Sequence, residues 1–275
     1  MAVDFRSLWD FSNPALSEAR FRAELATAQG DDSLILRTQI ARTFGLRRDF
    51  EQARTELALV AANLDAAGGE ARARYHLELG RTYASATHPP ETQTEETASI
   101  ARREYHRAWE VAQSAGLDNL VIDAIHMLAF VDPAPADQVK WAEAALAVST
   151  ASSQPDARRW EAPLRHNLGY GLHQLGRFDD ALVQFEAAVR LRTEGGADAA
   201  GTRVGRWMVA WTLRALNRLD EALALQLALE AECDAAGAPD PYVFEELEHL
   251  YRARGDDSRA AGYAARRAAV TGATA

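Results

Sequence analysis

Two sets of aromatic side chains recur in this sequence at the spacing of successive helical turns. His166, Tyr170 and His173 form one set, and Trp207 and Trp211 form the other. Side chains three and four positions apart project from the same face of a helix. Imidazole and phenol groups donate hydrogen bonds, and indole rings supply apolar contact. These residue types at this spacing indicate a surface that binds a peptide or a partner segment.

Each of these residue types also has a simpler interpretation. Trp207 and Trp211 fit the core between repeats, because tryptophan is often buried without marking a binding site. Exposed arginines often do no more than neutralise neighbouring acids. His166 and His173, together with His126, suggest a metal site, but no local ligand spacing supports one. We therefore predict no metal and no cofactor, and both interpretations of the tryptophans stay open.

No catalytic motif stands in a context that supports it. The sequence has no HExxH, no GxGxxG after a strand, no GxxxxGK[ST] and no GxSxG. The pair Asp179-Asp180 precedes a predicted helix, where carboxylates cap the N-terminus and favour its dipole. Cys233 lies between Glu232 and Asp234, and acidic neighbours raise the pKa of a thiol rather than lower it. We predict that the chain is not an enzyme.

Composition and charge exclude several classes of partner. The chain has 275 residues, of which 48% are hydrophobic, and a formal net charge of −10. Nonspecific nucleic-acid binding needs a basic surface, so we expect no nucleic acid. No apolar run approaches the ~20 residues of a membrane span, and the N-terminus does not resemble a secretory signal. With a single cysteine as well, the sequence predicts a cytoplasmic protein that contacts no membrane.

One phrase recurs in register along the chain and predicts its architecture. A clear copy covers residues 168–188, and the same frame fits 40–60, 209–229 and, more loosely, 247–260. A repeated helix pair cannot bury its apolar face alone, so the copies must stack into a solenoid. A small residue in each phrase, such as Gly169, allows the first helix of a pair to approach the second.

The phrase also divides the chain. Residues 1–30 are predicted to form a leading helix that covers one end of the stack, residues 31–270 a single solenoid, and residues 271–275 a flexible tail. The predicted helix pairs are 34–67, 73–115, 120–151, 159–193, 202–236 and 241–270. The polar stretch 85–97 is expected to be a surface loop, either simply solvated or acting as a lid or partner contact.

These repeats resemble the tetratricopeptide repeat (TPR) family over nearly everything after Asp31. Their period of about 40 residues exceeds the usual ~34. It is similar to the extended repeats of Pins-type and kinesin-light-chain-type adaptors, of bacterial peptide-sensing regulators and of bacterial standalone TPR proteins of unassigned function. The resemblance implies an all-α, right-handed superhelical α-solenoid of about six antiparallel helix pairs with an N-terminal capping helix. It also implies a concave groove that holds peptides or partner segments.

Helical geometry selects the residues expected to face this groove. If the small residue of each phrase faces the paired helix, residues about 100° around the first helix face the concave side. They are Arg42, Arg81, His126, His166, Asn167, Tyr170, His173, Trp207, Trp211, Arg214, His249 and Arg252. Because the set is rich in basic, imidazole and indole groups, it favours an acidic or C-terminal peptide segment.

Within this set, the resemblance implies a special role for Asn167. Related superhelical proteins often use asparagine at this place to grip a peptide backbone. In this sequence the comparable places of other repeats carry Gln39, Glu78 and Met208.

Three functional hypotheses stay open at this stage. The leading one is a scaffold or adaptor that binds a peptide or protein segment in the groove. The second is a signalling regulator that changes its superhelical pitch when a peptide or metabolite binds. The third is a homo-oligomeric structural protein, suggested by the exposed apolar groove and by the irregular last repeat, which has Glu248 at the small position and Arg267 near an apolar one.

Overall fold

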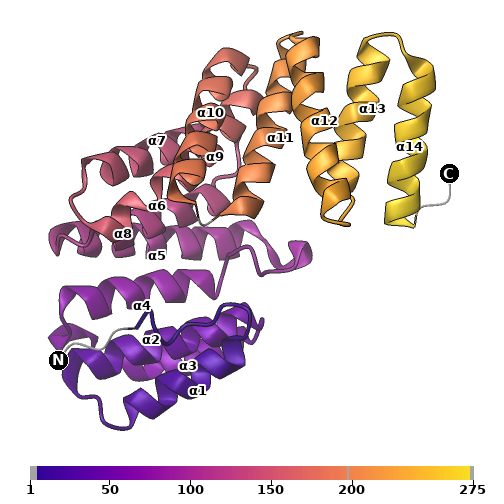
Figure 1. Cartoon of the computed structure of the whole chain (residues 1–275). Coiled ribbons are helices and arrows are strands. Elements are labelled where there is room, and N and C mark those ends of the chain that lie inside the picture. The colour runs from indigo at the N-terminus through magenta and orange to yellow at the C-terminus, as the bar shows by residue number, and fades with distance from the viewer. Residues whose placement is uncertain (1–4, 197, 273–275) are drawn as a thin grey trace. The chain divides into compact units, whose positions relative to one another are not determined.

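The computed structural model describes residues 5–196 and 198–272, and all regular elements in these residues are helices (Figure 1). The chain divides into two compact units, one ending at Trp160 and the other beginning at Glu161. None of the described helices combines the length and hydropathy that a bilayer-spanning segment needs.

The first unit consists of a leading helix followed by stacked helix pairs. Its α-helices are α1 (Pro14–Leu25), α2 (Gly30–Leu46), α3 (Phe50–Ala61), α4 (Gly69–Arg81), α5 (Glu95–Ser114), α6 (Asp118–Val131), α7 (Pro135–Ala151) and α8 (Pro155–Arg158), with the short 3-10 helices η1 (Leu64–Ala66) and η2 (Pro90–Thr92). From α1 to α7, each α-helix packs against the next, and α2 also packs against α4, as does α4 against α6. The first helices of successive pairs are therefore neighbours.

The second unit repeats this pattern. It contains α9 (Glu161–Gln174), α10 (Phe178–Gly195), α11 (Ala199–Ala215), α12 (Leu219–Ala235), α13 (Pro241–Ala253) and α14 (Asp257–Thr271). Successive helices again pack together, and α11 also contacts α13. With α2/α3, α4/α5 and α6/α7 of the first unit, these make the six predicted helix pairs. The all-α, TPR-like fold predicted from the sequence is confirmed.

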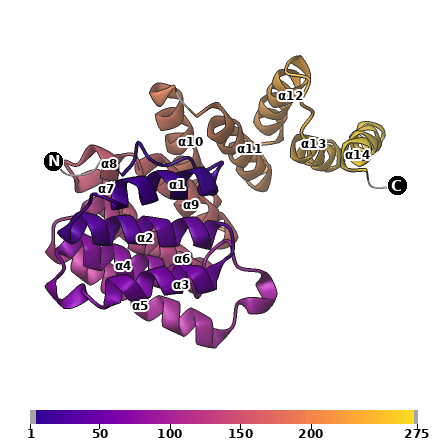
Figure 2. The same ribbon diagram turned by 90° about the horizontal axis from the view of Figure 1, so that it is seen from below.

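The leading helix is held by local and tertiary contacts. Asn13 caps α1 by accepting a hydrogen bond from the Leu16 amide, and Pro14 opens the first turn. Phe21 is fully buried against Leu36 and Ile40 of α2, and Figure 2 shows α1 lying along α2. The division into residues 1–30, 31–270 and 271–275 stays a prediction, and 273–275 lie outside the described residues.

The small residues of the repeated phrase lie where two helices approach most closely. A β-carbon placed on Gly80 would come within 2.6 Å of the Tyr105 ring, and one on Gly169 within 2.9 Å of the Phe185 ring. Both rings are fully buried. The predicted role of the small residue in pairing the two helices is confirmed at these positions.

The loop after α4 is anchored rather than simply solvated. His88 is only 7% exposed and stacks on Phe50 with 3.8 Å between ring centroids. Its Nε2 lies 3.2 Å from the Thr82 carbonyl oxygen. The loop ends earlier than expected, because Thr94 caps α5 in a reciprocal pair with Thr97. The His88 imidazole thus fixes the loop against the start of α3.

The close approach at Gly169 predicts an opposite response from two glycines of the second unit. Gly169→Ala should destabilise the protein by about 1–3 kcal/mol, because the added methyl group overpacks the contact with Phe185. Gly262→Ala, within α14 where nothing lies within 4 Å, should stabilise it by about 0.5–1 kcal/mol. Urea unfolding of both variants measures the difference. A stabilising Gly169→Ala would contradict the packing described here.

Candidate functional site

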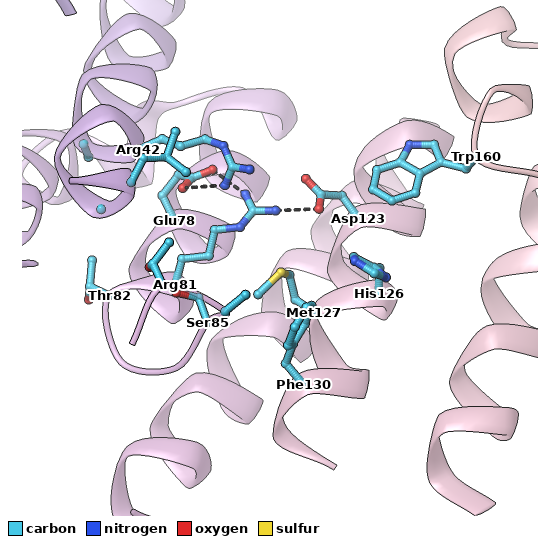
Figure 3. A pocket seen from close by; sticks show the side chains of 15 residues that line it. Arg42, Glu78, Arg81, Thr82, Ser85, Asp123, His126, Met127, Phe130 and Trp160 are labelled. Carbon is cyan, nitrogen blue, oxygen red and sulfur yellow. Dashed lines mark hydrogen bonds and ion pairs between the residues drawn. The ribbon is translucent and has the colours of Figure 1, made fainter. Parts of the chain in front are cut away.

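A pocket of about 250 Å³ lies in the first unit, where the first helices of three successive pairs meet. Its walls come from α2, α4 and α6, from the loop after α4 and from Trp160. Three predicted site residues line it, namely Arg42, Arg81 and His126 (Figure 3). Polar groups form one side, and Met127 and Phe130 contribute apolar surface.

The polar side of this pocket is an ion-pair network. Arg81 donates one hydrogen bond to Glu78 at 2.5 Å and another to Asp123. Arg42 lies 3.5 Å from the same Glu78 carboxylate (Figure 3). The side chain of Arg81 is 10% exposed and that of Arg42 26%. Arg81 is therefore fixed by two carboxylates, whereas Arg42 keeps donor capacity toward the pocket.

Burial and neighbouring charges set the pKa values in the network. Burial alone would raise the pKa of the Asp123 carboxyl, but the Arg81 and Arg42 guanidiniums hold it below its usual value. The pKa of Arg81 is raised, because its two carboxylates outweigh burial. Burial and the nearby Arg81 charge lower the pKa of Arg42, against the pull of Glu78. The network is thus charged and balanced near neutral pH.

An aromatic wall completes the pocket. His126 contacts the rings of Phe130 and Trp160, each with 5.4 Å between centroids. The Trp160 indole donates a hydrogen bond to Asn119 at 2.9 Å, which fixes its orientation. Burial lowers the pKa of His126, with Asp123 opposing and Arg81 reinforcing the shift. A neutral imidazole can both donate and accept a hydrogen bond.

The second unit carries a row of stacked rings from α9 and α11. His173 stacks on Trp211 with centroids 3.3 Å apart, and Tyr170 stacks on the same indole at 6.3 Å. Trp207 lies 5.9 Å from Trp211 along the helix. Tyr170 is 42% exposed, and both tryptophans are partly buried. The tryptophans thus pack together and also reach the surface, and their role in binding stays a prediction.

Two histidines of the second unit are held neutral. Burial, reinforced by Arg192, lowers the pKa of His166 to about 4. Burial and the nearby Arg214 have the same effect on His173, whose pKa falls to about 4. One ring nitrogen of each, Nδ1 of His166 and Nε2 of His173, has no hydrogen-bond partner among the described residues.

The remaining predicted arginines also contact carboxylates. Arg214 forms a two-pronged pair with Glu246, at 2.6 and 3.0 Å. Arg252 donates to Glu248 at 2.9 Å. The positive charge expected of the concave face is therefore offset by acids of neighbouring helical turns and helices.

The predicted site residues fall into two groups, one in each unit. Arg42, Arg81 and His126 share the pocket of the first unit. The others belong to the second unit, in which Asn167 and His249 lie partly buried on α9 and α13. That all of them form one binding surface stays a prediction. Within residues 5–196 and 198–272, no group of three His, Cys, Asp or Glu side chains is placed to hold a metal ion.

Three residues that shape the pocket were not among the site residues predicted from the sequence. Asp123 precedes His126 by three positions, so helical spacing alone could have placed it on the same face. Glu78 stands in the same relation to Arg81. Trp160 lies outside any copy of the phrase, and no local pattern connects it to α6.

Comparisons with known proteins identify the fold but not a close relative. The sequence matches no protein-family model and no curated protein. The apo form of RapI is similar over 98% of this chain and 76% of its own, with a TM-score of 0.76 and 10% identity. A Rap protein complexed with competence and sporulation factor is similar over 96% of this chain and 73% of its own, with a TM-score of 0.56 and 12% identity.

A third similar structure contains a tetratricopeptide repeat sensor. It is a signal transduction ATPase of the STAND class with a tetratricopeptide repeat sensor, from Pyrococcus horikoshii. It is similar over 92% of this chain, which spans 38% of that longer protein, with a TM-score of 0.71 and 11% identity. Together these likenesses support the TPR-like fold.

The buried network predicts a large energetic role for Arg81. Arg81→Met should lower the free energy of unfolding by about 3 kcal/mol or more, because Glu78 and Asp123 would lose their buried counter-charge. Arg159→Met is the matched control, since that side chain is 74% exposed beside Asp156 and such pairs contribute about 0–1 kcal/mol. Equal losses in thermal or urea unfolding would contradict the network's role.

The two neutral histidines predict a stability that declines in mild acid. Their pKa values lie near 4 in the folded chain and near 6.5 when unfolded, so the unfolded chain takes up more protons between these values. Stability is therefore fully present above about pH 6.5 and falls toward pH 4. Thermal unfolding between pH 7 and 4.5 should show a smaller decline when both His166 and His173 are replaced by Gln. An unchanged decline would show that other groups cause it.

Proposed function

We propose that this chain is a peptide- or protein-binding module and that the pocket between α2, α4 and α6 is its principal contact site. The observation that carries this proposal is the state of Arg42, a partly exposed guanidinium whose one carboxylate contact among the described residues is 3.5 Å long. It lies in a pocket whose other charges are already paired. Such a group can bind a ligand oxygen without first breaking a strong ion pair.

The chemistry of the pocket suits a segment of peptide chain. Two guanidiniums and two carboxylates offset each other there, so the pocket offers directed hydrogen bonds rather than a strong positive field. Phe130 is 44% exposed, and with Met127 it provides apolar contact for a ligand side chain. We therefore favour a segment with an apolar side chain and at most one carboxylate, which fits the C-terminal alternative of the sequence-based prediction better than the acidic one.

The scaffold and regulator hypotheses differ in what binding does to the chain. The likeness to a Rap protein complexed with competence and sporulation factor favours a regulator as the second candidate. A repeat stack can change its curvature because each repeat contacts only its neighbours. A scaffold would bind its partner with its shape unchanged.

A peptide selection tests the proposal. Peptides displayed as a random library should include binders of the full chain, and Arg42→Gln should weaken these about tenfold by removing a charge-assisted hydrogen bond. Arg107→Gln is the control, since that arginine is 58% exposed on α5 and lies outside the pocket. Calorimetric titration measures both variants. If no peptide binds, or if Arg42→Gln binds as well as the control, the proposal fails.

Solution scattering on the same complexes separates the two candidates. A change in the radius of gyration when the peptide binds favours the regulator, and an unchanged radius favours the scaffold.

A further inference from the structure

A second pocket, of about 370 Å³, lies within the second unit beside the row of stacked rings. One stripe of α11, which includes Arg203, Val204 and Trp207, forms one wall. The end of α12 and the start of α13 form the others. None of the residues that line this pocket belongs to the pocket proposed above.

Most of the pocket surface is apolar. Val204 is 50% exposed and Tyr242 is 66% exposed, so both side chains present apolar surface to a ligand. Leu229 and Cys233 are almost fully buried and line the pocket. The Trp207 indole donates to the Tyr242 carbonyl oxygen at 2.9 Å, which fixes this wall across α11 and α13. The apolar surface is therefore pre-formed.

The Cys233 thiol adds to this apolar character. Burial raises its pKa, and Asp240 adds to the shift while Arg203 opposes it. From the sequence, the raised pKa of the Cys233 thiol was attributed to the adjacent Glu232 and Asp234. In the structure these two acids contribute less to that shift than burial and Asp240 do. A protonated, buried thiol behaves as a small hydrophobic group.

One cation at this pocket has no ion-pair partner within the residues that the structure describes. Arg203 is exposed and forms no hydrogen bond or ion pair with any other residue of 5–196 and 198–272. Nearby on the same helix, Arg206 pairs with Glu232 at 2.6 Å. The other charged group of the pocket, Asp240, accepts the Tyr242 amide at 2.9 Å as the cap of α13. Its negative charge is partly offset by the helix N-terminus.

We propose that this pocket binds a small organic anion with an apolar body, whose carboxylate pairs with Arg203. The volume bounds the size of the ligand, because 370 Å³ holds roughly twelve non-hydrogen atoms at the ~30 Å³ that each water takes up in the liquid. A straight-chain carboxylate of eight carbons meets both requirements. This inference is independent of the proposed peptide site, since the two pockets share no residue.

Octanoate and 1-octanol are the matched probes, because they share the apolar chain and differ in charge. Calorimetric titration of the full chain should show octanoate binding about fivefold more tightly than octanol, the effect of one partly exposed ion pair. Arg203→Gln should abolish this preference and leave octanol binding unchanged. Asp240→Asn should tighten octanoate binding, because asparagine keeps the cap on α13 and removes a like charge.

Two further measurements place the ligand in this pocket. Val204→Trp should fill the pocket from its exposed side and abolish binding of both probes, with circular dichroism confirming the fold. Cys233 is the only cysteine of the chain, so octanoate should slow its alkylation in the wild-type protein and not in Val204→Trp. The proposal is overturned if neither probe binds, if both bind the wild type equally, or if binding leaves the alkylation rate unchanged.

Discussion

The close contact between a glycine and an aromatic ring is the constraint on which two of the helix pairs, α4/α5 and α9/α10, depend. Gly80 meets Tyr105, and Gly169 meets Phe185, with no room for a β-carbon between them. This glycine–ring contact sets the distance between the two helices of a pair. It leaves the opposite face of the first helix available for a pocket. The pocket of the first unit is built from that available face. Packing within a pair thereby positions side chains that take no part in it.

The charge pattern shows how a protein of net charge −10 keeps several arginines on its first helices. Arg81 and Arg214 each meet carboxylates that are themselves largely buried, Glu78 and Glu246. A buried acid without its arginine would carry a large desolvation penalty, so the two members of each pair depend on each other. Arg42 and Arg203 differ from these, since one has only a long contact and the other has none among the described residues. Both therefore keep donor capacity for a ligand.

Sequence periodicity predicted the helix pairs and their small residues, because both depend on residues close together in the chain. It also chose the face of α4 and α6 that carries Arg81 and His126. It did not predict that Arg81 pairs with Asp123, since the two are 42 positions apart in different repeats. Trp160 and the pocket around Cys233 were missed for the same reason. The contents of a site between helices depend on neighbours that no local spacing reveals.

The pairing of Arg81 has a consequence for how ligand binding in the first pocket would depend on salt concentration. At physiological ionic strength, mobile ions screen the attraction between charges that lie more than about 8 Å apart, and they screen exposed charges most. In this pocket the counter-charges of Arg81 lie in direct contact and are largely shielded from solvent. Added salt would find little long-range attraction to screen. Ligand recognition in this pocket would depend on the geometry of hydrogen bonds, and the binding affinity would change little between low and high salt concentrations.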